Sequence, residues 1–134
     1  MTGHPTMSVR PDGTQEWRLP NGQLHRDNGP AAIYSNGSEY WYQHGKLHRD
    51  NGPALSYPDG AEFWFRHGKL HRDGAPACTH PNGYEAWYQH GQHHRDNGPA
   101  ATYSDGTREW WINGTQVTEF EHTVVARAAT RHAP

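Results

Sequence analysis

The sequence predicts an all-β fold: a stack of antiparallel β-hairpin repeats with a 23-residue period and a short C-terminal capping helix. Three observations predict this fold. A His-Arg-Asp segment, a tryptophan and a pair of glycine turns all recur at that interval. A fixed period of this size indicates one small unit that is copied and stacked, since a single copy cannot bury its own apolar side. The repeated residues are His25, His48, His71 and His94, and Trp17, Trp41, Trp64, Trp87 and Trp110, with one extra residue in the first tryptophan interval.

Two turn signals divide each copy into short strands. The first is Asn-Gly or Asp-Gly, as at Asn36-Gly37, and the second is His-Gly in the middle copies, as at His44-Gly45. Asn-Gly and Asp-Gly between short aromatic runs are typical of tight β-hairpins. Asn, Asp and His are the non-glycine residues that best tolerate a positive φ, so the His-Gly pairs fit the same role. We therefore expect an antiparallel meander of about nine or ten strands.

Strand alternation sorts the aromatic residues onto two faces. Trp41 shares a face with Glu39 and Gln43, whereas Tyr40 and Tyr42 point the other way. The tryptophan position is filled in every copy, while its neighbours are aromatic only in the middle copies. We therefore expect the tryptophan ladder to form the spine of the core.

The repeat pattern ends after Gly114 and gives way to a helical one. Thr118 and Glu121 have the spacing of a capping box, and apolar residues follow at helical intervals: Phe120, Val124, Val125 and Ala128. An amphipathic helix here would cover the exposed edge of the sheet. The predicted organisation is a flexible N-terminus at residues 1–8, a single domain of four full repeats and a terminal half repeat at 9–117, a capping helix at 118–130 and a tail at 131–134.

Composition narrows the class of protein. The chain has 134 residues and a net charge of −2, so it is not built mainly to neutralise nucleic-acid phosphates. Cys78 is the only cysteine, which excludes an internal disulfide and indicates no oxidising compartment. There is no apolar run of the ~20 residues that a membrane span needs, and residues 1–8 lack the apolar centre of a secretion signal. We expect a cytoplasmic protein.

The His-Arg-Asp motif suggests catalysis or metal binding, and neither interpretation fits its spacing. The protein-kinase catalytic loop needs an asparagine five residues after its aspartate, and Leu55 stands there after Asp50. Histidines one repeat apart lie ~9.5 Å from each other by strand spacing, too far to share a zinc ion with bonds of ~2.1 Å. We expect neither an enzyme, nor a metal site, nor a cofactor.

Two other interpretations of the motif stay open. In the first, the arginines and histidines form a row of donors for phosphates or carboxylates, and the aromatic face stacks bases or sugars. In the second, the motif is structural: Asp and Gly-Pro build a turn, Pro30 marks a strand start, and each arginine makes ion pairs with an aspartate of its own or a neighbouring repeat.

The stretch Trp41-Tyr42-Gln43-His44-Gly45-Lys46-Leu47-His48 resembles the MORN repeat, and Trp64 to His71 follows the same pattern. The resemblance covers residues 9–117 and departs from the family after the histidine, where Arg-Asp-Asn-Gly-Pro-Ala replaces Gly-x-Gly. It is closer to variant repeats of bacterial, phage and large-virus proteins. The resemblance implies an elongated hairpin stack that serves as a binding or assembly surface, sometimes as a homodimer, with no catalytic residues.

We therefore expect a non-enzymatic module that binds a partner protein, such as a host or defence protein inhibited by a phage-type protein in the host cytoplasm. The alternative is a binder of a small phosphorylated or nucleotide-like ligand on the Arg/His rows. The predicted contact residues are Tyr40, Tyr42, Phe63, Phe65 and Tyr88 on the aromatic face, Arg49, Arg72 and Arg95 in the arginine row, and His48, His71 and His94 in the histidine row.

Overall fold

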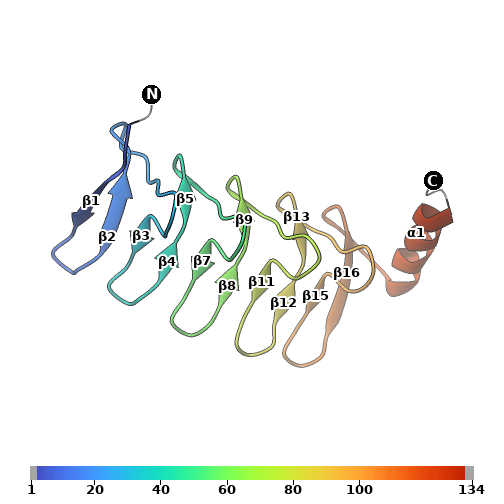
Figure 1. Cartoon of the computed structure of the whole chain (residues 1–134). Coiled ribbons are helices and arrows are strands. Elements are labelled where there is room, and N and C mark those ends of the chain that lie inside the picture. The colour runs from blue at the N-terminus through green and yellow to red at the C-terminus, as the bar shows by residue number, and fades with distance from the viewer. Residues whose placement is uncertain (1–2, 132–134) are drawn as a thin grey trace. The chain divides into compact units, whose positions relative to one another are not determined.

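A computed structural model describes residues 3–131 of the chain, which divides into two compact units, Met1–Lys69 and Leu70–Pro134. Each unit is a mostly antiparallel β meander of short strands, and the second unit ends in a helix packed against its sheet (Figure 1). The predicted all-β hairpin meander with a C-terminal helix is confirmed. The boundary between the units falls inside the segment 9–117 that we predicted as one domain.

In the first unit, the strands β1, β2, β3, β4, β7 and β8 lie side by side in that order. β5 and β6 form a separate hairpin in which Tyr42 faces Leu47. The bounds are β1 Thr6–Val9, β2 Gln15–Arg18, β3 Ala32–Ile33, β4 Glu39–Tyr40, β5 Tyr42–Gln43, β6 Lys46–Leu47, β7 Leu55–Ser56, β8 Glu62–Phe63 and β9 Phe65–Arg66, and the unit ends within β10 Lys69–Leu70.

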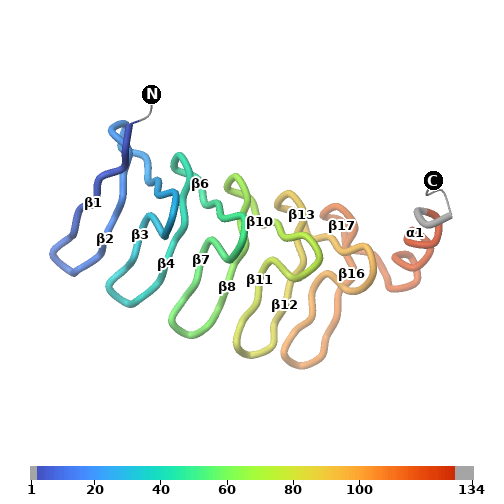
Figure 2. The backbone as a smooth tube through the Cα atoms, viewed as in Figure 1, coloured from blue at the N-terminus to red at the C-terminus, as the bar shows by residue number. Residues whose placement is uncertain are grey.

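The second unit repeats this arrangement, with β11, β12, β15, β16 and β17 side by side and β13 paired with β14. Its bounds are β11 Cys78–Thr79, β12 Glu85–Ala86, β13 Tyr88–Gln89, β14 Gln92–His93, β15 Ala101–Thr102, β16 Arg108–Ile112, β17 Thr115–Val117 and α1 Glu119–Arg131. The backbone trace shows the same double turn recurring within each unit (Figure 2).

The strands are shorter and more numerous than predicted because the repeat tryptophan interrupts a strand in each of the three middle copies, at Trp41, Trp64 and Trp87. Trp41 separates β4 from β5; its N–H donates to the carbonyl of Ala54 at 2.7 Å and its carbonyl accepts from the N–H of His48 at 3.0 Å. The strand thus changes partner at the tryptophan, from the strand of the following copy to the second strand of its own hairpin. One predicted strand therefore becomes two.

The cross-strand register repeats with the period of the sequence. The opposed pairs are Ala32 and Tyr40, Leu55 and Phe63, Cys78 and Ala86, and Ala101 and Glu109, each 23 residues after the one before. A copied register means that each copy presents the same positions to the same face.

Both turns form as the sequence predicts. In the first turn the side-chain oxygen of Asn36 accepts the backbone N–H of Ser38 at 2.9 Å, and the equivalent Asp or Asn does so in every copy. In the second turn His44, His67 and His90 have φ of 49°, 51° and 53°, and Asn113 has 46°. The interpretation of the turn histidines as residues that tolerate a positive φ is confirmed.

The core consists of small residues, which corrects the expectation of a tryptophan spine. Eight alanines in or near the strands are between 0% and 3% exposed, whereas Trp41 and its equivalents are only half-buried. Small side chains here allow the loops and the strands to approach closely. The core alanines are Ala31, Ala32, Ala54, Ala61, Ala77, Ala86, Ala100 and Ala101, with Leu55 and Cys78 beside them.

The helix α1 begins with the predicted capping box. The N–H of Glu121 donates to Thr118 Oγ1 at 3.1 Å, and the N–H of Thr118 donates to Glu121 Oε1 at 2.9 Å. α1 packs against β16, but the face we expected to be buried is exposed: Phe120 is 77% exposed, and Val124 and Val125 about half.

The polar residue His122 is buried in their place, at 5% exposure. The helix extends to Arg131, which we had assigned to the tail, and residues 132–134 lie outside the described part of the chain.

The first strand also corrects the predicted boundaries. β1 spans Thr6–Val9 and pairs with β2, so Thr6, Met7 and Ser8 belong to the sheet rather than to a flexible N-terminus. Residues 1–2 lie outside the described part of the chain.

Candidate functional site

The predicted contact residues fall into two groups on opposite faces of the strands. Tyr40 and Tyr42 flank Trp41, so strand alternation directs them away from it. The arginines and histidines lie in the loop that follows the second strand of each hairpin, and this loop folds back over the tryptophan face. The first group is thus open at its surface and the second is covered by its own copy.

Three of the four motif arginines, Arg26, Arg49 and Arg95, have their guanidinium group over the tryptophan ring of their own copy. The guanidinium carbon of Arg49 is 3.8 Å from the centre of the Trp41 ring, and Arg26 and Arg95 lie 3.9 Å from Trp17 and Trp87. This distance is well inside the range of a cation–π contact. The cation is thereby anchored inside the copy.

The same guanidiniums also close the loop. Arg49 Nη1 donates to the carbonyl of Pro53 at 3.2 Å, and each of the other three motif arginines makes the equivalent bond. A Cβ on Gly52 would lie 2.6 Å from the Arg49 guanidinium carbon. The glycine before the proline is therefore present because the guanidinium fills the space between it and the indole.

Each histidine of the motif joins its own loop to the following copy. The backbone N–H of His44 donates to His25 Nδ1 at 3.0 Å, and His67 donates to His48 in the same way. Since Nδ1 accepts, the proton of the neutral ring lies on Nε2. Equivalent bonds join His90 to His71 and Asn113 to His94.

The Nε2 atom of His48 faces Asp50 Oδ1 at 3.0 Å, as His25 faces Asp27 and His94 faces Asp96. The structural interpretation of the motif had the arginine pair with an aspartate, but in these three copies the aspartate of the motif faces the histidine instead. The aspartate pairs with the histidine because the arginine already contacts the tryptophan ring and donates to the proline carbonyl.

Shallow polar grooves lie between consecutive loops. One of about 500 Å³ is lined by Asp27, Asn28, Trp41, Gln43, Arg49 and Asp50, and another of the same size surrounds Trp87 in the second unit. Gln43 Nε2 donates to the Arg26 carbonyl at 3.0 Å, so the groove walls are themselves hydrogen-bonded. Within residues 3–131, no three His, Cys, Asp or Glu side chains are arranged to hold one metal ion.

The opposite face of the first unit carries a band of half-buried aromatic rings. Tyr40 is at its centre, with ring centroids 4.8 Å from Tyr34, 6.4 Å from Tyr42 and 6.1 Å from Tyr57. Tyr57 also contacts Phe63 edge-on at 5.8 Å. The hydroxyls of Tyr40 and Tyr57 are 3.0 Å apart, and this bond, together with burial, raises the pKa of Tyr57 to about 12.

The second unit has its own aromatic band. Tyr84 lies 5.1 Å from Tyr103, and burial raises the pKa of Tyr84 to about 12. His93 is enclosed between Tyr88 at 4.2 Å and the stacked ring of Trp111 at 4.8 Å. Burial lowers the pKa of His93, because the charged imidazolium loses its hydration there.

Sequence reasoning found only part of these bands. Tyr40, Tyr42, Phe63 and Tyr88 contact other rings of these bands, and strand alternation assigns Phe65 to the same face. The missing rings are Tyr34, Tyr57, Tyr84, Tyr103, His93 and Trp111. Tyr34, Tyr57 and Tyr103 each precede a repeat tryptophan by seven residues, a signal that the 23-residue spacing could have given.

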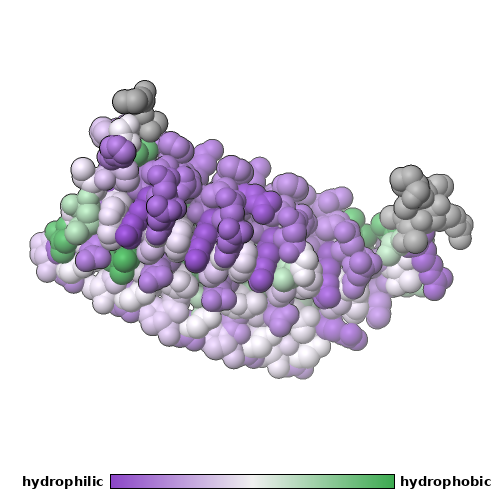
Figure 3. Space-filling view, in the orientation of Figure 1, coloured by the Kyte–Doolittle hydropathy of each residue, from purple (hydrophilic) through white to green (hydrophobic). Residues whose placement is uncertain are grey.

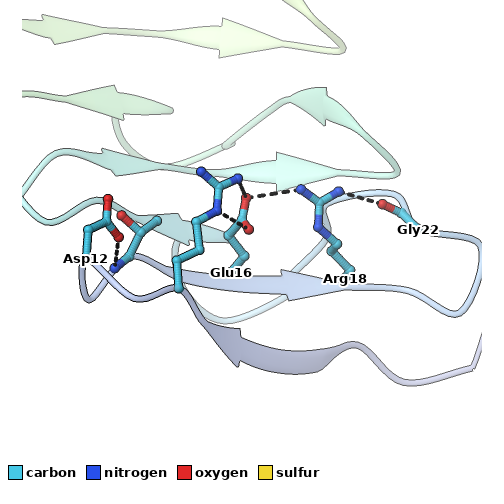
Figure 4. A network of polar contacts seen from close by, with 6 residues as sticks. Asp12, Glu16, Arg18 and Gly22 are labelled. Atoms are coloured by element: carbon cyan, nitrogen blue, oxygen red, sulfur yellow. Dashed lines mark hydrogen bonds and ion pairs between the residues drawn. The ribbon is translucent and has the colours of Figure 1, made fainter.

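Charged groups replace the rings in the first copy. Glu16 stands where Tyr40 stands in the next copy, and its carboxylate is only 7% exposed. Arg10 binds it through two nitrogens at 2.8 and 3.0 Å, and Arg18 adds a contact at 3.0 Å (Figure 4). Arg18 also donates to the carbonyl of Gly22 at 2.7 Å.

The last copy has a related feature. Glu109 occupies the same position as Glu16 and accepts from the Tyr103 hydroxyl at 3.0 Å and from Trp111 Nε1 at 3.3 Å. The aromatic bands therefore end in hydrogen-bonded carboxylates.

The rest of the visible surface is mostly hydrophilic, and its hydrophobic patches lie over β1 and beside α1 (Figure 3). Met7 and Val9 on β1 are about half exposed, as are Val124 and Val125 on α1. Among the described residues, no helix has the length and apolar character to cross a bilayer.

Comparison with family models and with curated proteins finds no match for this chain.

Proposed function

We propose that this chain is a non-catalytic β-repeat module that binds a partner protein through its aromatic bands. The observation that carries the proposal is the set of half-buried tyrosine and phenylalanine rings on the face that the loops leave open. Tyrosine combines a large apolar ring with a polar end and loses little conformational entropy on binding, so it is enriched where proteins meet.

The arginine and histidine rows are a weaker candidate surface. The Arg49 guanidinium is held between Trp41 and Gly52, and both nitrogens of His48 face partners within the protein. A phosphate bound there would compete with contacts that hold the loop. For this reason we favour a protein ligand over a small phosphorylated one.

The MORN-like resemblance of the repeats supports the same function, since that family is used as a binding surface. We extend the proposal to a host or defence protein as the partner and to the cytoplasm as the place of binding, on that resemblance.

The test is a pair of capture experiments with tagged protein in a lysate of the source cells. The double variant Tyr42→Ala with Phe65→Ala removes rings from the aromatic face, whereas Glu62→Ala alters an exposed residue on the opposite face of the same region. We expect one protein to be retained by the wild type and by Glu62→Ala and lost by the double variant. Near-UV circular dichroism and a cooperative urea transition establish that the double variant is folded.

A second arm tests the small-ligand alternative. Inorganic phosphate or adenosine monophosphate should leave the melting temperature of the wild type unchanged, because ligand binding would raise it by mass action. A rise that disappears in Arg49→Lys would overturn our preference for a protein partner, as would capture that persists in the ring-deleted variant.

A further inference from the structure

The last copy differs from the earlier ones in what covers its tryptophan. Trp87 is followed eight residues later by Arg95, whose guanidinium lies 3.9 Å from the ring centre. Trp110 is followed at the same distance by Thr118, which caps α1 instead. A motif arginine lies over the rings of Trp17, Trp41 and Trp87, whereas the sequence provides no motif arginine for the ring of Trp110.

A cleft opens at that position, between the preceding loop and the helix. Its volume is about 810 Å³, compared with about 500 Å³ for the groove at Trp87. The wall formed by α1 is fixed by His122, whose Nε2 donates to the Arg95 carbonyl. The lining includes the indole of Trp110, the acidic residues Asp96 and Glu119, and the basic residues Arg108 and Arg127.

The lining has the chemistry that a guanidinium needs. The half-buried indole of Trp110 offers a π face, while the exposed carboxylates of Asp96 and Glu119 stand on opposite walls. A planar guanidinium can stack on an indole and donate to carboxylates from its edge at the same time.

One group of the chain already reaches toward this position, but loosely. The guanidinium carbon of Arg108 lies 5.4 Å from the Trp110 ring centre, well beyond the 3.8–3.9 Å of the earlier copies. Arg108 is exposed, and the middle copies carry a glutamate at its position, such as Glu85. The side chain is thus free to give way to a cation that fits more closely.

We propose that this cleft binds an external guanidinium group, as carried by an arginine side chain, flat against Trp110. The site lies on the face opposite the aromatic band and does not depend on the function proposed above. The protein supplies three examples of the complex, because its own arginines bind its own tryptophans in this way.

The test is a titration followed by the indole N–H signals in ¹H–¹⁵N NMR spectra. The probe is N-acetyl-arginine methylamide, and N-acetyl-citrulline methylamide is the control of equal shape without charge. We expect the arginine probe to shift the Trp110 signal with saturation and the citrulline probe to leave it in place. Free arginine and a blocked peptide with one arginine then distinguish a metabolite from a protein segment as the source of the group.

Four variants locate the site. Trp110→Leu should abolish the saturable shift, and Glu119→Gln should weaken the affinity about two- to fivefold. Arg108→Glu, which restores the residue type of the middle copies, should strengthen it by a similar factor. Phe120→Ala, on the exposed side of α1, should have no effect.

Equal shifts with the citrulline probe, or unchanged affinity in both Arg108→Glu and Glu119→Gln, would overturn the proposal. Arg108→Glu and Glu119→Gln keep the indole of Trp110, so they test the site even where Trp110→Leu weakens the fold. Tyr42→Ala should leave the titration unchanged, and for this reason failure here is separate from failure of the aromatic band to bind a protein.

Discussion

The glycine of the Asp-Asn-Gly-Pro segment is the residue on which the guanidinium–indole contact depends most directly. Gly52 has no Cβ because the Arg49 guanidinium occupies that space, 2.6 Å from where the atom would be. The third copy solves the same problem differently, with Gly74 at a φ of 77° followed by Ala75. In that copy the glycine stands one residue earlier, and the methyl group of Ala75 takes the position that corresponds to Gly52.

Replacement of Gly52 by alanine should therefore lower the free energy of unfolding by about 1–3 kcal/mol, the usual cost of an overpacked site. The measurement is a urea titration followed by tryptophan fluorescence. The matched control is the pair Asn51→Gly with Gly52→Ala, which copies the third repeat and should recover part of the loss. An equal loss in the single and the double variant would contradict the steric explanation.

Cys78 provides a residue-scale probe of the second unit. Burial raises the pKa of its thiol to about 11, so at neutral pH almost none of the reactive thiolate is present. We expect iodoacetamide to leave the native protein unmodified at pH 7.5 over hours and to alkylate it within minutes in concentrated urea. Mass spectrometry measures both rates, and rapid modification of the native protein would show that this part of the core opens freely.

At the scale of the element, the hairpin β13–β14 places His93 between two aromatic rings. Burial lowers the pKa of His93, so the unfolded chain binds a proton at a higher pH than the folded protein does. Stability is therefore full above the unfolded value, near ~6.5, and falls as the pH drops through and below it.

We expect the melting temperature to fall between pH 7.5 and pH 5, and His93→Gln to reduce this dependence. His44→Asn is the control, since Asn stands at the equivalent turn in the outer copies and His44 is exposed. Thermal melts at four or five pH values test the prediction. A pH dependence of the same size in wild type and His93→Gln would assign it to other groups.

The helix α1 replaces an amide donor of the earlier copies. Gln43 and Gln89 each donate to the carbonyl of the preceding motif arginine, but Ile112 stands at that position in the last copy and cannot donate. His122 donates to the Arg95 carbonyl instead. The helix is thus positioned by a hydrogen bond to the repeat backbone.

His122→Ala should lower the free energy of unfolding of the second unit by about 1–3 kcal/mol, because it leaves a carbonyl without its donor. His122→Gln supplies the same kind of donor as Gln43 and should retain part of that stability. The measurement is amide hydrogen exchange along β16 and α1, which reports the second unit separately. Equal exchange in the alanine and glutamine variants would rule out the hydrogen bond as the cause.

At the scale of the whole molecule, the sequence predicted what depends on local chemistry. The period, both turns, the capping box and the two faces of the strands follow from short segments such as Asn36-Gly37 and Thr118 to Glu121. The core and the arginine contacts depend on how the loop folds back over the tryptophan, and no local sequence pattern predicts the path of that loop.

The exposed side of α1 was mispredicted for a similar reason. An apolar stripe usually marks the buried face of a helix, but here a hydrogen bond from His122 decides which side faces the sheet. In the candidate site, strand alternation predicts the face on which each ring lies. It does not predict the contacts that the motif arginines and histidines make within the protein.

The repeat architecture itself is testable through chain length. The middle copy around Trp41 carries its own Arg–Trp contact and its own His-mediated bond to the next copy, so a copy inserted among the middle ones should add its own stabilising contacts. We expect insertion of a second copy of residues 35–57 to raise the urea m-value roughly in proportion to the added length. An unchanged or lower m-value would show that the inserted copy does not join the cooperative structure.

The carboxylate networks of the terminal copies have a consequence for descent. Glu16 with its two arginines and Glu109 with its two donors place a hydrogen-bonded carboxylate where the inner copy around Trp41 places the ring of Tyr40. Duplication of an inner copy would leave both of these carboxylate networks intact and would lengthen the chain by 23 residues.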